Sequence, residues 1–257
     1  MVDVSERYET VAGCKVHTLR GGTGPTLLFL HGGGGAGTWL PFHEKLAQRY
    51  HVIVPEHPGF GRSERPAWAD NVGDLAMFYL DFMQALGLAD VHLVGTSLGG
   101  WIAADLATRN TKNLRTLTLV APAGLYVEGV GKGDIFLWTP EESARNFFAD
   151  PALSEAALKR DVSEEEGVRQ TKNAEMLAKL AWSPRLFSHD LPKWLHRIDV
   201  PTMIVWGDQD KVLEPGHGPA FRDLIPGAKL ETIAACGHLP HIEKADDLAA
   251  LIGGFAK

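Results

Sequence analysis

A serine flanked by two glycines marks the point where a hydrophobic stretch gives way to an alanine-rich one. Residues Gly95–Gly99 read Gly-Thr-Ser-Leu-Gly, follow the apolar run Val91–Val94 and precede the stretch Gly100–Ala107. This context predicts a strand, a tight turn and a helix, with the Ser97 hydroxyl projecting above a sheet. Glycines are needed beside such a serine because side chains there would collide with the neighbouring strand and helix. A serine held in this way is a candidate nucleophile, provided that a base takes its proton.

The candidate base is a histidine close to the end of the chain. His238 lies in a loop between the last predicted strand and the last predicted helix. This position places its ring at the carboxyl edge of a sheet, where the Ser97 hydroxyl is also expected. His241 is the nearby alternative, for which a surface or supporting hydrogen bond is the simpler interpretation.

The candidate orienting acid follows the strand before that histidine. The segment Trp206–Asp210 reads Trp-Gly-Asp-Gln-Asp and offers two aspartates. Asp210 is favoured because Gly207 and the next two residues can turn the chain back toward the sheet edge. Asp208 is better suited to stabilising that turn through the backbone. Ser97, Asp210 and His238 then form a set in the order nucleophile, acid, base.

The negative charge that develops on an attacked carbonyl oxygen needs hydrogen-bond donors fixed in advance. The run His31–Gly35 contains four consecutive glycines directly after a predicted strand. Backbone without side chains lets N–H groups approach an oxyanion closely. We expect one donor to be the N–H of Gly33, with Gly34 as the alternative, and the other to be the N–H of Leu98, the residue after the nucleophile.

Apolar runs of strand length alternate with helical patterns along the chain. Most runs are continuous, as is typical of strands buried on both faces of a largely parallel sheet. Such strands are predicted at Thr26–Leu30, Val52–Val54, Val91–Val94, Leu114–Val120, Thr202–Trp206 and Lys229–Ile233, with antiparallel edge strands near Tyr8–Val11 and Lys15–Leu19. Helices are predicted over Asp74–Leu86, capped by Gly87, and over Ala245–Phe255.

Residues 123–195 interrupt this alternation. The interval is rich in Ala, Glu and Leu, and helices are predicted around Thr139–Phe148, Ala152–Arg160 and Gly167–Leu180. A helical block between two strands indicates a lid over the carboxyl edge of a core formed by residues 1–122 and 196–257. Aromatic side chains between lid and core commonly line an apolar pocket. The candidates for substrate binding are Trp39, Trp138, Phe147 and Trp182.

The composition of the chain limits the classes of partner that we expect it to bind. The chain has 257 residues, 45% of them hydrophobic, and a formal net charge of −7. It has no Lys/Arg cluster typical of nucleic-acid binding and no apolar stretch long enough to span a bilayer. Its first residues lack a secretion signal, and its two cysteines, Cys14 and Cys236, do not indicate a disulfide scaffold. We therefore expect a cytoplasmic protein that acts on a small molecule and binds neither nucleic acid nor membrane.

Two motifs indicate other chemistries. Gly32, Gly34 and Gly37, with Glu56 near the end of the next strand, match a dinucleotide-binding pattern. Pro41 disturbs the helix that this pattern requires, and the pattern leaves the serine and the late histidine unexplained. A zinc-binding helix motif begins at His43–Glu44, but Ala47 occupies the second ligand position. We therefore expect neither a metal nor a cofactor.

Together these motifs resemble the α/β-hydrolase superfamily, as does the loop Pro58–Ser63. The resemblance implies an α/β fold with a mostly parallel central sheet flanked by helices, an inserted helical lid, and a serine hydrolase acting on a carboxylic ester. The glycine run followed by Ala36–Trp39 is similar to carbon–carbon bond hydrolases of aromatic ring-fission products. Those enzymes usually carry a tryptophan where this chain has Leu239. A ligand-binding protein without catalysis is the alternative from another class, because a fold does not fix a function.

Overall fold

The computed structural model describes residues 2–256 and contains one eight-stranded sheet, in the order β1-β2-β4-β3-β5-β6-β7-β8. The strands are β1 Val4–Val11, β2 Cys14–Gly21, β3 Thr26–Leu30, β4 His51–Pro55, β5 Val91–Thr96, β6 Leu114–Val120, β7 Thr202–Gly207 and β8 Lys229–Ile233. β2 pairs antiparallel with β1 and β4, and every other pair is parallel. The prediction of a mostly parallel sheet is thus confirmed, and the two early strands form an antiparallel pair at one edge, in which β1 is the edge strand.

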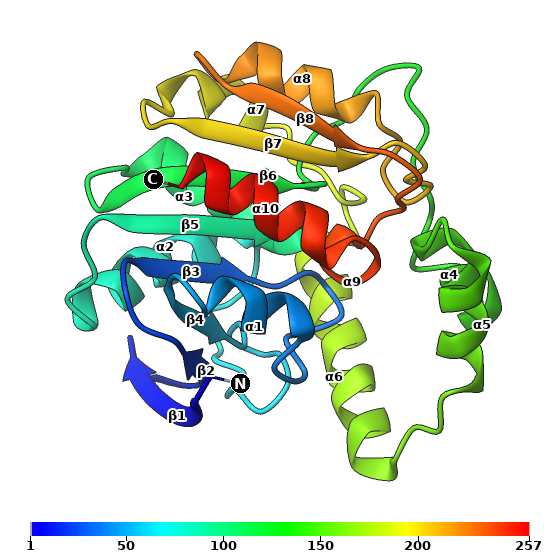
Figure 1. Ribbon diagram of the computed structural model, residues 1–257, viewed down its shortest axis with the longest axis horizontal. Coiled ribbons are helices and arrows are strands. Elements are labelled where there is room, and N and C mark those ends of the chain that lie inside the picture. Colours follow the sequence, from blue (N-terminus) through cyan, green and yellow to red (C-terminus); the bar gives the residue numbers. More distant parts are fainter. Residues whose placement is uncertain (1, 257) are drawn as a thin grey trace.

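Helices cover both faces of the sheet. α1 Pro41–Leu46 and α10 Ala245–Phe255 lie in front of it in Figure 1, and α2 Val72–Ala85 and α3 Leu98–Arg109 lie behind it. The buried apolar residues accordingly form two clusters, one on each side of the sheet. Every residue of β5 and β7 is buried, which explains why these strands are continuous apolar runs in the sequence.

The strand register aligns the points where the chain leaves the sheet. Leu30 of β3 pairs with Gly95 of β5, and Gly95 pairs in turn with Leu119 of β6. The residues that follow these strands therefore meet at one edge of the sheet. β5 runs two residues beyond the predicted Val94, because Gly95 and Thr96 still pair with β6.

The chain between β6 and β7 is helical and carries the three helices predicted there. They are α4 Pro140–Phe147, α5 Pro151–Lys159 and α6 Glu164–Ala181, followed by the short α7 Leu191–Trp194 and a 3-10 turn, η1 Leu195–Arg197. The side chains of Thr139, Asp150 and Ser163 accept hydrogen bonds from the first-turn amides, which fixes where α4, α5 and α6 begin.

We call residues 123–195 the helical insertion; its helices α4, α5 and α6 stand to the right of the sheet in Figure 1. No helix among residues 2–256 combines the length and the apolar character needed to cross a membrane.

Candidate active site

Ser97 occupies a strained turn between β5 and α3. Its φ is +52° and its ψ is −114°, a conformation that a residue with a side chain rarely adopts. A Cβ on Gly95 would lie 2.3 Å from the Gly99 oxygen, and a Cβ on Gly99 would lie 2.1 Å from the Leu30 oxygen. Only glycine fits at either position, because α3 approaches β3 and β5 this closely. The turn therefore holds the Ser97 side chain out over the sheet edge.

A hydrogen-bonded line joins the three residues that the sequence singles out. Ser97 Oγ lies 2.9 Å from His238 Nε2, and His238 Nδ1 lies 2.8 Å from Asp210 Oδ2. The backbone N–H groups of Val212 and Leu213 donate to Asp210 Oδ1 at 2.8 and 2.9 Å. The carboxylate is thus buried but fully hydrogen-bonded, which keeps its second oxygen directed at the histidine.

The two alternative residues, Asp208 and His241, take no part in this line of described hydrogen bonds. Asp208 is exposed, and its Oδ1 accepts a 3.3 Å hydrogen bond from the Cys236 amide, so it ties two loops together. His241 lines the same cavity as His238, but its buried Nδ1 has no partner among the described residues. Burial lowers the pKa of His241 to about 4 and keeps its ring neutral.

The glycine run forms a tight turn whose peptide groups have defined directions. The oxygen of Gly32 accepts hydrogen bonds from the Gly35 amide at 3.1 Å and from His31 Nδ1 at 2.7 Å. In a trans peptide the C=O and N–H bonds point in opposite directions, so the Gly33 N–H is directed away from these donors. Gly33, Ser97 and Leu98 line one cavity. Leu98 is the first residue of α3, where a helix leaves its N–H groups without intrahelical acceptors.

His57 and Tyr79, two buried residues that were not selected from the sequence, support this turn. The ring of His57 stacks on that of His31 at 3.6 Å, and the His57 amide donates to His31 Nε2 at 2.9 Å. His57 Nε2 contacts the His31 oxygen at 2.8 Å, and the Tyr79 hydroxyl donates to His57 Nδ1 at 2.5 Å. Burial lowers the pKa of His31 to about 4 and that of His57 well below its usual value. The only sequence signal for His57 is a polar residue two positions after the end of a buried strand.

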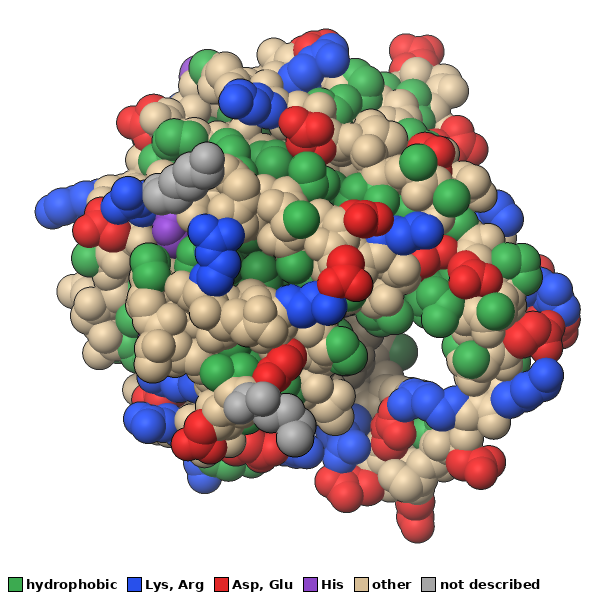
Figure 2. All heavy atoms as spheres, viewed as in Figure 1, with side chains coloured by type: hydrophobic (Ala, Val, Ile, Leu, Met, Phe, Trp, Pro, Cys, Tyr) green, Lys and Arg blue, Asp and Glu red, His purple; other side chains and the backbone are tan. Residues whose placement is uncertain are grey.

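A cavity of about 530 Å³ lies between these groups and the helical insertion. Figure 2 shows an opening between the insertion and the rest of the molecule, with hydrophobic side chains above and to the right of it and charged side chains below it. The insertion contributes mainly apolar side chains to the lining, namely Ile135, Phe147, Phe148, Leu177 and Leu186, with Arg160 and Gln170 as its longer polar ones. The cavity therefore favours a largely apolar ligand.

Of the four aromatic residues selected from the sequence, Phe147 alone is among the described residues that line this cavity. Trp39 packs on His43 and donates its Nε1 hydrogen to Glu44, so it lies against α1. Trp138 stands edge-on to Phe147, with ring centroids 6.2 Å apart. Trp182 is 46% exposed and stacks under the Arg185 guanidinium. The prediction that these three tryptophans line the pocket is corrected accordingly.

Among residues 2–256, the residues of the dinucleotide pattern and of the zinc pattern do not form a ligand site. Glu56 is 1% exposed, lies 3.1 Å from His17 Nδ1 and accepts a hydrogen bond from the Arg62 amide, so it is enclosed rather than open to a ribose. In the part of the chain that the structure describes, no three His, Cys, Asp or Glu side chains are grouped to hold a metal ion.

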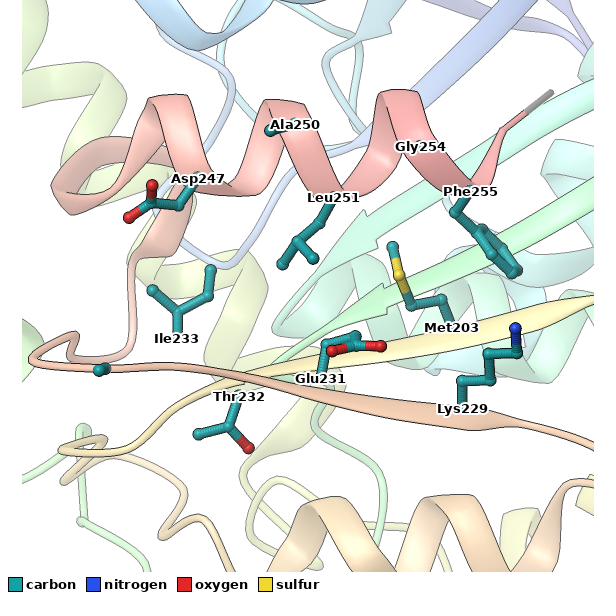
Figure 3. A pocket seen from close by; sticks show the side chains of 11 residues that line it. Met203, Lys229, Glu231, Thr232, Ile233, Asp247, Ala250, Leu251, Gly254 and Phe255 are labelled. Atoms are coloured by element: carbon teal, nitrogen blue, oxygen red, sulfur yellow. The ribbon is translucent and has the colours of Figure 1, made fainter.

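A second hollow, of about 620 Å³, lies between β7, β8 and α10 (Figure 3). Its lining mixes the charged side chains of Lys229, Glu231 and Asp247 with apolar ones such as Met203 and Leu251. Within residues 2–256 this lining includes neither serine nor histidine, so it lacks the nucleophile–base pair found at the other cavity.

Comparison with known proteins agrees with this geometry. The chain matches the model of the alpha/beta hydrolase family over residues 27–251. It is 30% identical to Lipase 3 of Moraxella sp. strain TA144, with 88% of this chain and 76% of the lipase covered. It is 27% identical to the 2-hydroxy-6-oxo-6-phenylhexa-2,4-dienoate hydrolase of Burkholderia cepacia, covering 90% and 87%. The crystal structure of a membrane phospholipase A superimposes with a TM-score of 0.81 at 29% identity, covering 98% and 85%.

Proposed function

The chain belongs to the alpha/beta hydrolase family, and from this premise we propose that it is a serine hydrolase that cleaves a small or medium, apolar or aromatic carboxylic ester. The observation that carries the proposal is the line from Ser97 Oγ through His238 to Asp210, at 2.9 and 2.8 Å, on the wall of a largely apolar cavity.

In the proposed reaction, His238 Nε2 takes the proton of Ser97 Oγ while that oxygen bonds to the ester carbonyl carbon. The negative charge moves to the carbonyl oxygen, where the N–H groups of Gly33 and Leu98 stabilise it. The tetrahedral intermediate then expels the alkoxide, which leaves as an alcohol with the proton held by His238. A water molecule, deprotonated by the same ring, attacks the acyl group on Ser97. The acid is released when the bond to Ser97 Oγ breaks and that oxygen takes the proton back from His238. Asp210 stabilises the imidazolium in both halves of the cycle.

A second candidate is hydrolysis of a carbon–carbon bond in a dienoate. It is favoured by the relative from Burkholderia cepacia, whose name states this activity and which aligns along most of both chains. The apolar lining suits a phenyl or alkyl group on either kind of substrate. The two candidates differ in the leaving group, which is an alcohol in the first and a carbon acid in the second.

The test is turnover by the wild-type protein and by Ser97→Ala. We expect p-nitrophenyl butyrate hydrolysis to fall at least about a thousandfold, because Ser97 supplies the attacking oxygen in the proposed reaction. A fluorophosphonate probe followed by peptide mapping should label Ser97 only in the wild type. Ser143→Ala is the matched control, since this serine lines the same cavity without a base beside it in the described hydrogen bonds.

A Ser97→Ala protein that retained its turnover would contradict the proposed mechanism. A phenyl-substituted dienoate, assayed beside the ester panel, separates the two candidates by the ratio of their kcat/KM values. Tight binding of either compound without turnover would instead support the non-catalytic alternative.

A further inference from the structure

We infer that Asn173, on helix α6 of the insertion, is a positioning residue for the backbone donor at Gly33; this inference rests on the proposed function. Asn173 is 6% exposed and lies far along the chain from the groups it contacts. Its Nδ2 donates to the Gly34 oxygen at 2.8 Å, and its Oδ1 accepts from the Gly61 amide at 2.8 Å. Since an amide N–H can only donate and a carbonyl oxygen can only accept, these two partners fix the orientation of the Asn173 side chain.

The hydrogen bond from Asn173 to the Gly34 oxygen fixes the direction of the Gly33 N–H through two peptide groups. The Gly34 oxygen and the Gly35 N–H belong to one planar trans peptide, so an oxygen directed at Asn173 directs that N–H the opposite way. The Gly35 N–H donates to the Gly32 oxygen at 3.1 Å. That oxygen shares a second planar peptide with the Gly33 N–H. Fixing the first peptide therefore fixes the second, and with it the direction of the proposed oxyanion donor.

Successive hydrogen bonds of this kind also polarise one another, which strengthens the last donor. The relay runs from Asn173 Nδ2 to the Gly34 oxygen, then from the Gly35 N–H to the Gly32 oxygen, and ends at the Gly33 N–H. His31 Nδ1 donates to the same Gly32 oxygen from the core. The turn is thus held from both sides, by a core histidine and by an amide on the insertion.

The packing around Asn173 explains why this turn consists of glycines. A Cβ on Gly35, whose φ is +92°, would lie 2.4 Å from Asn173 Nδ2. A Cβ on Gly33 would lie 2.6 Å from a methyl carbon of Leu177, one turn further along α6. The bare backbone therefore lets α6 approach the turn closely enough for the side-chain amide to reach it.

The neighbouring residue, Lys172, provides a matched control. Its Nζ donates to the oxygens of Gly61 and Ser63, at 2.9 and 2.6 Å. It therefore ties α6 to the loop after β4 and makes no contact with the Gly32–Gly35 turn among its described hydrogen bonds. Loss of Lys172 weakens the attachment of the insertion, whereas loss of Asn173 weakens both that attachment and the orientation of Gly33.

The experiment compares Asn173→Ala, Asn173→Asp and Lys172→Met with the wild type. Asp has the size of Asn and keeps the acceptor for Gly61, but it places an oxygen against the Gly34 oxygen. Removing an oxyanion donor costs about a hundredfold or more in kcat, so we expect misdirecting one to lower kcat about tenfold in both Asn173 variants. KM should change less than about twofold, and Lys172→Met should keep kcat within about twofold of the wild type.

A second measurement distinguishes an effect on the orientation of the Gly33 N–H from an effect on the packing of the insertion. A trifluoromethyl ketone forms a tetrahedral oxyanion on the serine, so its affinity should fall by the same factor as kcat. The affinity for the product acid should stay constant. Equal losses in Lys172→Met and Asn173→Ala, or wild-type kcat in Asn173→Asp, would overturn the inference and leave the proposed function intact. Retained turnover in Ser97→Ala would overturn both.

Discussion

The cavity has two walls that are built in different ways. On the sheet wall, backbone geometry holds Ser97, the proposed oxyanion donor at Gly33 and Asp210: a positive φ at Ser97, a hydrogen-bonded turn at Gly32–Gly35, and two amides that fix Asp210. On the insertion wall, the groups are side chains such as Phe147 and Leu177 that present apolar surface. Asn173 differs from these apolar side chains because, like Lys172, it hydrogen-bonds from the insertion to the backbone of the core.

The difference separates residues that take part in the proposed reaction from residues that determine which substrate fits. A group held by backbone geometry has one position, so replacing it removes a step of the proposed reaction. An apolar side chain contributes area that its neighbours share, so replacing it changes how well a substrate fits. We therefore expect substitutions on the sheet wall to act mainly on kcat and those on the insertion wall to act mainly on KM.

The largest loss of kcat on the sheet wall is expected at Asp210. In Asp210→Asn the remaining oxygen can still accept from Val212 and Leu213, which turns the new NH₂ group toward His238 Nδ1. His238 must then accept at Nδ1 and carry its proton on Nε2, where it can no longer take the proton of Ser97. We expect kcat for an ester to fall about ten-thousandfold at pH 7.

The control for this loss is Asp208→Asn, two residues earlier. Asp208 accepts from the Cys236 amide, and an asparagine oxygen can accept the same hydrogen bond. We expect kcat to stay within about twofold of the wild type. A comparable loss in both variants would show that the loop, rather than the tautomer of His238, controls turnover.

The next effect concerns stability, and it arises from buried histidines of the core rather than of the insertion. Burial lowers the pKa of His43 to about 3 and that of His31 to about 4, as for His241. The unfolded chain takes up a proton at each histidine as the pH falls below about 6.5, while the folded chain does not. Stability is therefore full above that pH and falls between pH 6.5 and about 4, by about 1.4 kcal/mol per pH unit for each histidine.

His43→Leu tests this dependence at one residue. The ring packs among Phe29, Phe42 and Trp39, so leucine suits the site, although the acceptor for the Leu40 amide is lost. Urea unfolding at pH 7, 6 and 5 should show a free energy of unfolding that declines less steeply than in the wild type. The difference at pH 5, relative to pH 7, should be about 2 kcal/mol. Parallel curves for the two proteins would show that His43 is not held neutral in the folded chain.

The contrast between the two walls also explains which residues of the site could be predicted from the sequence. Ser97 follows β5 directly, while Asp210 and His238 lie in the short loops three residues after the end of β7 and five residues after the end of β8. The carboxyl ends of neighbouring parallel strands meet at one edge. A local pattern therefore suffices to bring them together. The glycines beside Ser97 are likewise explained by contacts within the turn and with the adjacent strand.

The insertion wall could not be predicted in this way. Helices α4, α5 and α6 were predictable from composition and caps, but their placement depends on contacts far apart in the sequence. The hydrogen bonds of Asn173 join residues that are 139 and 112 positions apart. Trp182 and Phe147 look alike as aromatic residues in a helical block, and only the packing of that block decides which one faces the cavity.

The smallest expected effect compares these two aromatic residues. Phe147 lines the cavity, packs against the His238 ring with centroids 5.7 Å apart, and accepts the His238 amide with its backbone oxygen. Phe147→Ala keeps that backbone hydrogen bond and removes apolar surface. We expect KM for a phenyl ester to rise about five- to tenfold, in line with about 25 cal/mol for each Å² of apolar surface that the substrate no longer buries, and kcat to change less than threefold.

Trp182→Ala is the control, because it removes a larger but half-exposed ring outside the cavity and should leave KM within twofold. Michaelis–Menten constants for a phenyl and an acetyl ester of the same alcohol, measured on both variants, provide the check. If Phe147→Ala instead lowered kcat and left KM unchanged, this ring would act by holding His238 and would belong functionally to the sheet wall.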